Sequence, residues 1–457
     1  MSKYENLSEV VEQTKKLLVE FCSDWSIKGI IRSESQIRFS GNSIDIHKNW
    51  DEIKLDLFLS KNRRTTEIAI SDLRPRAIEN TLKYCEKLLS AAKLNINYRK
   101  LPEGPFKYDS SLQNKIYDDK VVNLGEEAVD LVQDAINASL NQGAKRVAGS
   151  FFYGNSQFFI ENSKGRVANY RKTHLNLRVR AFAEDMYATG EALSCSTHLE
   201  KGFNATQAGE EAGQICKQAE GGKKGKPGLY NIIIYPSVAV ELQAPTPAIG
   251  MNSYMKKMGL SWLAGKKEGD KIANDIISVW DDGTMEYGLE SSLFDDECVP
   301  TKRTLLIDKG VIKEYFRNTS YTKKNQESTG NAGITMPKPT NTVFSTGDYT
   351  LEELMEISEK PTLIITSTWY TRYQSYAPPG ALSSLPKDGM FLVKDKGKFL
   401  EPVRELRINS DHFHMLEHTI GLGKDLQQVK TWLNMSGNTI FAPYMLIEDI
   451  RLTTGTK

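Results

Sequence analysis

Three of the six histidines of the chain lie in one short segment, HFHMLEH, at residues 412–418. His414, Glu417 and His418 form the pattern H-x-x-E-H, which one class of zinc peptidase places on a helix. On a helix the two histidines lie one turn apart on the same face, with the glutamate placed as a general base would be. The segment therefore raises the hypothesis of a zinc site.

A catalytic zinc ion needs a third protein ligand besides two histidines. Asp425 and Glu448 are candidates after His418, but two glycines separate them from the predicted helix. His412 points roughly opposite to His414, because two residues turn a helix by about 200°. A complete zinc site is therefore not evident from the spacing.

The alternative is a half-exposed helix over about residues 411–420, whose histidines lie on the surface or form hydrogen bonds. We expect its N-cap to be one of three polar residues, Asn409, Ser410 or Asp411. Its buried stripe would consist of Phe413, Leu416 and Ile420. We favour this alternative over a metal site.

Two further groups could do chemistry. The carboxylates of Asp295, Asp296 and Glu297 could bind a divalent metal ion, but capping and turn formation is the favoured interpretation for this strand-turn segment. The five cysteines are dispersed without a C-x-x-C pair, which is typical of reduced, buried thiols in a cytosolic protein. Cys298 paired with a distant histidine as a nucleophile is the less favoured alternative.

The charge balance excludes some classes of partner. Lys and Arg number 59 against 58 Asp and Glu, so the net charge of +1 gives no basic surface for nucleic acid or an anionic membrane. No apolar run has the length of a membrane span, and the first residues lack the apolar centre of a signal peptide. We expect a cytoplasmic protein.

Helical and strand periodicities alternate through the first half. Apolar residues at helical spacing predict helices near residues 7–25, 78–92 and 128–140. Short alternating stretches between residues 29 and 70 predict a meander of antiparallel strands, and further strands flank a turn at Asn162–Gly165. Another helix begins near Asn204, a plausible N-cap, and ends before the Gly/Pro-rich break at 221–228.

Strands and turns dominate after that break. A buried strand, LYNIIIYPS, leads into a short helix, and hairpin turns are evident in IDKGVIK and VKDKGKF. We predict an α+β fold with two domains. Residues 1–228 would form an N-terminal α/β domain of antiparallel strands with flanking helices, and residues 229–457 a mainly antiparallel, barrel-like β domain.

The second half also carries motifs that resemble those of the TldD/PmbA family. In that family a D-D-E-G-x-P-T segment precedes a strand-turn-strand and then an S-T-G-x-A-G segment. The corresponding residues are 295–301, Lys309–Gly310 and 328–333, and the stretches IRFSGNSI near residue 40 and WYTRYQSY at 369–376 extend the likeness over nearly the whole chain. Cys298 stands where the family usually has glycine, so a turn with positive φ would be strained there.

The resemblance implies one of two branches. The TldD branch is a zinc peptidase with an H-E-x-x-x-H motif on a helix after a buried strand, and a cysteine near the C-terminus completes its metal site. The TldE/PmbA branch lacks these ligands and is the partner subunit of a heterodimer. Here residues 240–243 are Val-Glu-Leu-Gln, no histidine lies between His198 and His412, and residues 420–443 contain no cysteine.

We therefore expect a TldE/PmbA-like, non-catalytic subunit of a two-component metallopeptidase that degrades peptides or unfolded segments. It would have no cofactor and no catalytic residue of its own. Its partner would be a TldD-like catalytic subunit or a second copy of the chain, with a peptide as substrate. Two alternatives stay open: an active metallopeptidase with zinc on His414, Glu417 and His418, and a homodimeric protein that binds peptides or small molecules.

Overall fold

The computed structural model describes residues 3–185, 187–243, 246–333, 335–374, 378–430 and 439–455. Six antiparallel strands of the first half form one curved sheet in the order β3-β2-β1-β4-β5-β6. The strands are β1 (Asp24–Ser40), β2 (Ser43–Lys61), β3 (Arg64–Ile70), β4 (Arg146–Asn162), β5 (Val167–Phe182) and β6 (Thr189–Ser196).

The predicted meander is corrected in one respect. The short strands expected before residue 60 are two long ones, because β1 and β2 pair continuously from Asp24↔Ser60 to Ser40↔Ser43 with a single register shift. The polar residues Ser33, Glu34 and Ser35 lie in the middle of β1, where β2 and β4 pair with both of its edges. Backbone pairing on two sides keeps a strand intact through a polar stretch.

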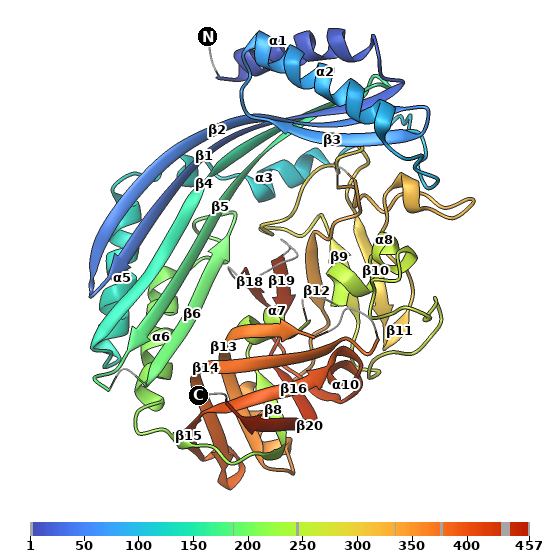
Figure 1. Cartoon of the computed structure of the whole chain (residues 1–457). Helices are drawn as coiled ribbons and strands as arrows, with labels where there is room; N and C mark the ends of the chain where they lie inside the picture. The colour runs from blue at the N-terminus through green and yellow to red at the C-terminus, as the bar shows by residue number, and fades with distance from the viewer. Residues whose placement is uncertain are drawn as a thin grey trace.

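Helices cover the outer face of this sheet at its two ends (Figure 1). The predicted stripe of the second helix is confirmed, since Ile78, Leu82, Cys85 and Leu89 are buried. The first helix is shorter than predicted, because it ends at Leu18 and Trp25 lies on β1. The first pair of helices packs over β1–β3, and the second pair packs over β4–β6. These helices are α1 (Lys3–Leu18), α2 (Pro75–Ala91), α5 (Glu127–Asn141) and α6 (Ala205–Gln218), and short turns between them are η1 (Ser110–Leu112), α3 (Gln113–Ile116) and α4 (Asp119–Val122).

A closed barrel of five strands forms the base of the second half, which confirms the barrel-like prediction. The ring closes because β13 pairs with β14 on one side and with β8 on the other. Its strands are β8 (Gly228–Ile234), β13 (Thr362–Tyr373), β14 (Ala381–Lys394), β16 (Leu406–Asp411) and β20 (Met445–Thr454), with β7 (Lys223–Lys224), β15 (Phe399–Arg404) and β17 (Thr419–Leu422) attached.

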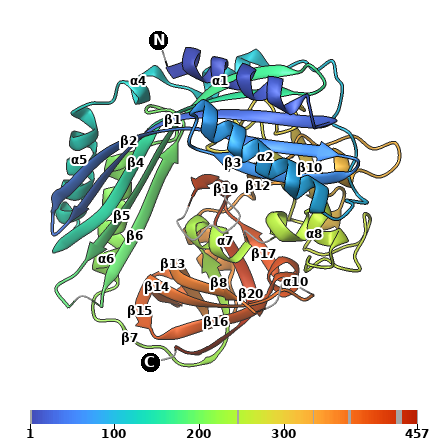
Figure 2. The same cartoon turned by 45° about the horizontal axis from the view of Figure 1, so that its top comes forward.

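A third sheet lies between the barrel and the curved sheet (Figures 1 and 2). Its order is β11-β10-β9-β12-β19-β18, and β12 pairs with β19 in parallel. The largest core fills the space between it and the barrel, and includes Trp262 and Phe316. The strands are β9 (Val279–Asp282), β10 (Arg303–Asp308), β11 (Val311–Ile312), β12 (Asn341–Phe344), β18 (Gln427–Val429) and β19 (Thr439–Ala442).

Short helices complete the second half. Among the described residues, none of the helices is long and apolar enough to span a membrane. Strands of the curved sheet end at Ser196, and described strands of the other two sheets begin at Lys223. The short helices are α7 (Pro236–Gln243), η2 (Thr246–Gly250), α8 (Ser253–Lys257), η3 (Thr319–Tyr321), α9 (Leu351–Ile357), η4 (Asp395–Gly397) and α10 (His412–Glu417).

Candidate functional site

The histidine-rich segment forms helix α10, which is shorter than predicted. Asp411 is its N-cap, as one of the three expected residues, and its Oδ1 accepts a hydrogen bond from the backbone N–H of His414 at 2.9 Å. The helix ends at Glu417 instead of continuing to residue 420, because residues 419–422 pair with β20 as strand β17. Ile420 is consequently exposed, which corrects its place in the predicted buried stripe.

His414 and His418 lie side by side on α10, as helical spacing requires. Their rings are stacked with centroids 3.9 Å apart. One ring nitrogen of each contacts a backbone oxygen: His414 Nε2 lies 3.0 Å from the carbonyl of Asp449, and His418 Nδ1 lies 3.0 Å from the carbonyl of His414. Each ring therefore has a single nitrogen left for a metal ion, and Glu417 is exposed.

The described ranges contain no group of three or more His, Cys, Asp or Glu side chains placed to hold a metal ion. The zinc hypothesis for His414, Glu417 and His418 stays a prediction to be tested by metal analysis. A metal ion on two imidazoles would lack the third protein ligand of a catalytic zinc site.

His412 corrects the expectation that the histidines of this segment are surface or hydrogen-bonded groups. Its side chain is 2% exposed, and its Nδ1 has no hydrogen-bond partner in the described structure. The ring packs against Trp262 at 5.1 Å and Tyr373 at 6.3 Å between centroids. Burial lowers its pKa to about 3, so this imidazole is neutral.

Helix α7 occupies the place where the family resemblance puts the zinc motif, directly after the buried strand β8. Its side chains carry no imidazole, and Val240, Glu241 and Gln243 are buried. The backbone carbonyl of Glu241 accepts a hydrogen bond from the hydroxyl of Tyr373. The helix is thereby fastened to β13 by its backbone.

The acidic segment at 295–297 shows the predicted turn chemistry at its first residue. Asp295 accepts hydrogen bonds from the backbone N–H groups of Glu297, Val299 and Ala332 at 2.8–2.9 Å. The bonds from Glu297 and Val299 close the turn, which confirms the capping role for Asp295, and the bond from Ala332 ties the turn to the segment 328–333.

Asp296 connects the two halves of the chain, which sequence reasoning did not predict. Its carboxylate lies 2.6 Å from Nζ of Lys28 on β1 and 3.3 Å from Nζ of Lys338. Burial alone would raise the pKa of Asp296, but the two lysines bring it below its usual value. The acidic segment is therefore an anchor for the curved sheet.

Cys298 adopts the strained conformation expected from its place in the motif, with φ at 66°. Its backbone carbonyl accepts a hydrogen bond from the hydroxyl of Tyr108 at 2.8 Å. The thiol is buried, and burial and the neighbouring Asp295 raise its pKa. Because the thiolate is the nucleophilic form, this environment disfavours the alternative of a catalytic cysteine.

A polar row on β5 faces the second half. Arg180 pairs with Asp388 of β14 at 2.8 Å, and Lys172 lies 3.9 Å from Glu290. Burial and nearby lysines lower the pKa of His174 to about 3. Buried and less buried side chains alternate along this strand, and its polar side forms ion pairs between the halves.

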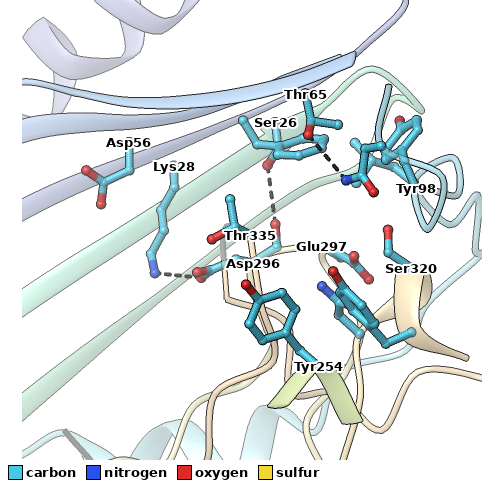
Figure 3. A pocket seen from close by; sticks show the side chains of 15 residues that line it. Ser26, Lys28, Asp56, Thr65, Tyr98, Tyr254, Asp296, Glu297, Ser320 and Thr335 are labelled. Atoms are coloured by element: carbon cyan, nitrogen blue, oxygen red, sulfur yellow. Dashed lines mark hydrogen bonds and ion pairs between the residues drawn. The ribbon is translucent and has the colours of Figure 1, made fainter. Parts of the chain in front are cut away.

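A cavity of about 160 Å³ lies beside Asp296, where the curved sheet meets the second half (Figure 3). No single motif marks it, because its walls come from segments up to about 300 residues apart in sequence. The lining residues used below are Lys28, Asp56, Phe58, Tyr98, Tyr254, Asp296, Glu297, Asn318 and Tyr321.

The protein consists of the curved sheet with its covering helices and a second half built on the five-stranded barrel. The described residues of these two parts contain no cluster of metal ligands. Models of the PmbA/TldA metallopeptidases match most of the chain: the C-terminal domain matches residues 227–454 and the central domain matches residues 125–217. The chain belongs to this family, the TldD/PmbA family.

Relatives and solved structures agree with this assignment. A "Metalloprotease TldD homolog" of Buchnera aphidicola is 29% identical over 191 residues, which cover 39% of this chain and only 37% of the relative. TldE from Thermococcus kodakarensis has a TM-score of 0.80 at 17% identity, covering 97% of this chain and all of that one. A Thermotoga maritima protein, described as a candidate modulator of a DNA gyrase, has a TM-score of 0.83 at 19% identity over 98% of this chain and all of its own. At these identities the two structures show the fold alone.

Proposed function

We propose that this chain is the metal-free, non-catalytic subunit of a two-component metallopeptidase that degrades peptides or unfolded segments. The observation that carries the proposal is helix α7. In the TldD branch the resemblance puts H-E-x-x-x-H on this helix, whereas here residues 240–243 are Val-Glu-Leu-Gln. An apolar valine and an amide cannot replace imidazole ligands of an open tetrahedral zinc site.

The burial of α7 supports the same proposal. Val240 is 1% exposed and Glu241 is 7% exposed, so these side chains pack into the protein. A scaffold that keeps the shape of a peptidase without its metal ligands acts through a partner, and the likeness of the fold to TldE agrees with a partner role. The partner would be a family member that carries the zinc motif, or a second copy of this chain.

Peptide binding in this proposal uses sheet edges. β3 is an end strand of the curved sheet, and an extended peptide can add to such an edge through backbone hydrogen bonds. Side-chain alternation then selects among peptides.

The first measurement is the metal content of tag-free protein by elemental mass spectrometry, together with peptide cleavage with and without a chelator. We expect no stoichiometric zinc and no cleavage by the isolated chain. Cleavage should appear when a family member with H-E-x-x-x-H is added, and should be chelator-sensitive.

A His414→Ala/His418→Ala variant distinguishes the alternative zinc site. Stoichiometric zinc and chelator-sensitive cleavage in the isolated chain, both lost in this variant, would overturn the proposal. The matched control is His47→Ala, since His47 contacts Tyr153 on the curved sheet, away from α10.

A further inference from the structure

The cavity beside Asp296 has walls from both halves of the chain. β1, β2 and the segment 95–101 supply one side, and α8, the acidic segment and residues 318–321 supply the other. Its volume of about 160 Å³ far exceeds the roughly 10–15 Å³ that one water molecule needs. The cavity can therefore hold a group of several heavy atoms.

Aromatic rings make up much of the lining. Phe58 and Tyr98 lie 5.9 Å apart between ring centroids, and Tyr254 and Tyr321 lie 5.3 Å apart in an edge-to-face arrangement. The faces of such rings attract cations through their quadrupoles. Aromatic walls alone would also suit a neutral ligand, so the charges decide between the two.

Carboxylates outnumber cations in the lining. Asp56, Asp296 and Glu297 face the cavity with Lys28 (Figure 3). Lysines already pair with two of these carboxylates: Lys28 and Lys338 lie 2.6 and 3.3 Å from Asp296, and Lys54 lies 3.5 Å from Asp56. Glu297 is the lining carboxylate that a further cation would meet. One oxygen of Glu297 accepts hydrogen bonds from the backbone and hydroxyl of Thr319. Burial raises the pKa of Glu297 to about 7, and a cation beside it would favour its ionised form.

Asn318 contributes a buried amide with an unsatisfied oxygen to the cavity wall. It is 3% exposed and lines the cavity, and its Oδ1 accepts no hydrogen bond from the described residues. Buried side-chain acceptors nearly always have a donor. An amide oxygen requires a donor, which is either a water molecule or a ligand group that carries N–H or O–H hydrogens.

We infer that this cavity binds a positively charged nitrogen group, an ammonium or a guanidinium, between the aromatic rings and the side chains of Glu297 and Asn318. The source would be either the basic side chain of a peptide or a small free amine or guanidine. Phosphate and carboxylate groups are disfavoured, because they would face the carboxylate of Glu297 with acceptors of their own.

The test is calorimetric titration of the isolated full chain with Nα-acetyl-arginine amide and with its citrulline counterpart, a neutral molecule of nearly the same shape. We expect saturable binding of the arginine compound, and at least tenfold weaker binding of the citrulline compound. Equal binding of the two compounds would overturn the inference. So would the absence of binding of the arginine compound up to about 10 mM, which means a binding free energy weaker than about 3 kcal/mol.

Two variants of the cavity make opposite predictions. Glu297→Gln keeps an acceptor for Thr319 but removes the charge, and should weaken arginine binding at least tenfold. Asn318→Asp adds a carboxylate of the same shape and should strengthen it, a result that misfolding cannot produce. Glu211→Gln, at a carboxyl on α6 outside the cavity, is the matched control and should leave binding unchanged.

Blocked peptides with one internal arginine distinguish the two sources. Tighter binding of the peptide than of the amide would identify a peptide side chain as the ligand, and equal binding would identify a small guanidine or amine. Either result supports the inference. It is independent of the proposed function, because binding is measured without a partner subunit and without cleavage.

Discussion

The ion pair between Lys28 and Asp296 allows a quantitative test of how the two halves are held together. Its atoms are 2.6 Å apart, and the two side chains are 16% and 9% exposed. Removing one partner of a buried pair costs about 3–5 kcal/mol, because the other charge stays buried without compensation. The structure predicts that the two possible removals differ in cost.

Asp296→Asn should be the more costly change. It leaves Lys28 without its closest counter-ion. Lys28 can then lose its proton, so the loss of stability cannot exceed the free energy of deprotonating this lysine at the given pH. Deprotonating a lysine with an ordinary pKa of 10.5 costs at most about 5 kcal/mol at pH 7 and about 2 kcal/mol at pH 9. Lys28→Met should cost less, about 1–2 kcal/mol, because Asp296 keeps Lys338 at 3.3 Å.

The assay is urea unfolding followed by tryptophan fluorescence, at pH 7 and pH 9, for both single variants and Lys28→Met/Asp296→Asn. We expect the double variant to be more stable than Asp296→Asn alone, and the cost of Asp296→Asn to fall as pH rises. Strict additivity of the two changes, within about 0.5 kcal/mol, would refute the reasoning, because it would mean that the charges do not interact.

Three further changes should alter the free energy of unfolding measured by urea titration, and a fourth is a control that should not. Burial raises the pKa of Glu211 from 4.5 to about 7, so the native state loses stability between these pH values as the pH rises. Glu211→Gln should therefore add about 1–3 kcal/mol to the free energy of unfolding at pH 8 but nothing at pH 4.5. An equal gain at both pH values would contradict this. Gly209→Ala should cost about 1–3 kcal/mol, because its Cβ would lie 2.2 Å from a backbone oxygen of α5. In Gly125→Ala the new Cβ would lie in open space, so the free energy of unfolding should change by less than about 0.5 kcal/mol. Thr350→Ala removes the capping box with Glu353 and should cost about 1 kcal/mol; no change would show that α9 needs no cap.

Local features were predictable from the sequence because their determinants lie close together in the chain. Asn204 caps α6, and Asp411 caps α10. The turn at Asn162–Gly165 forms with Gly165 at a φ of 70°. Each depends on hydrogen bonds that span a few residues, so residue type and spacing suffice.

Features that depend on distant segments were not predictable in the same way. The length of β1 is set by its pairing with β4, and its polar middle gave no sign of that pairing. The end of α10 is set by the pairing of Thr419 with β20, which competes with helical bonding. The cavity and the Lys28–Asp296 pair join residues from both halves, and no pattern within either half indicates that they meet.

The pairing of β1 with β4 also has a consequence for how the chain is made. Ser26 pairs with Asn162, so the second edge of β1 has no neighbour until well over a hundred further residues have left the ribosome. At usual rates of synthesis that interval lasts roughly ten seconds. During it the β1–β2 hairpin exposes a long row of free backbone groups, which is a site for pairing between nascent chains. Rapid translation or a chaperone that covers this edge should therefore raise the yield of folded protein.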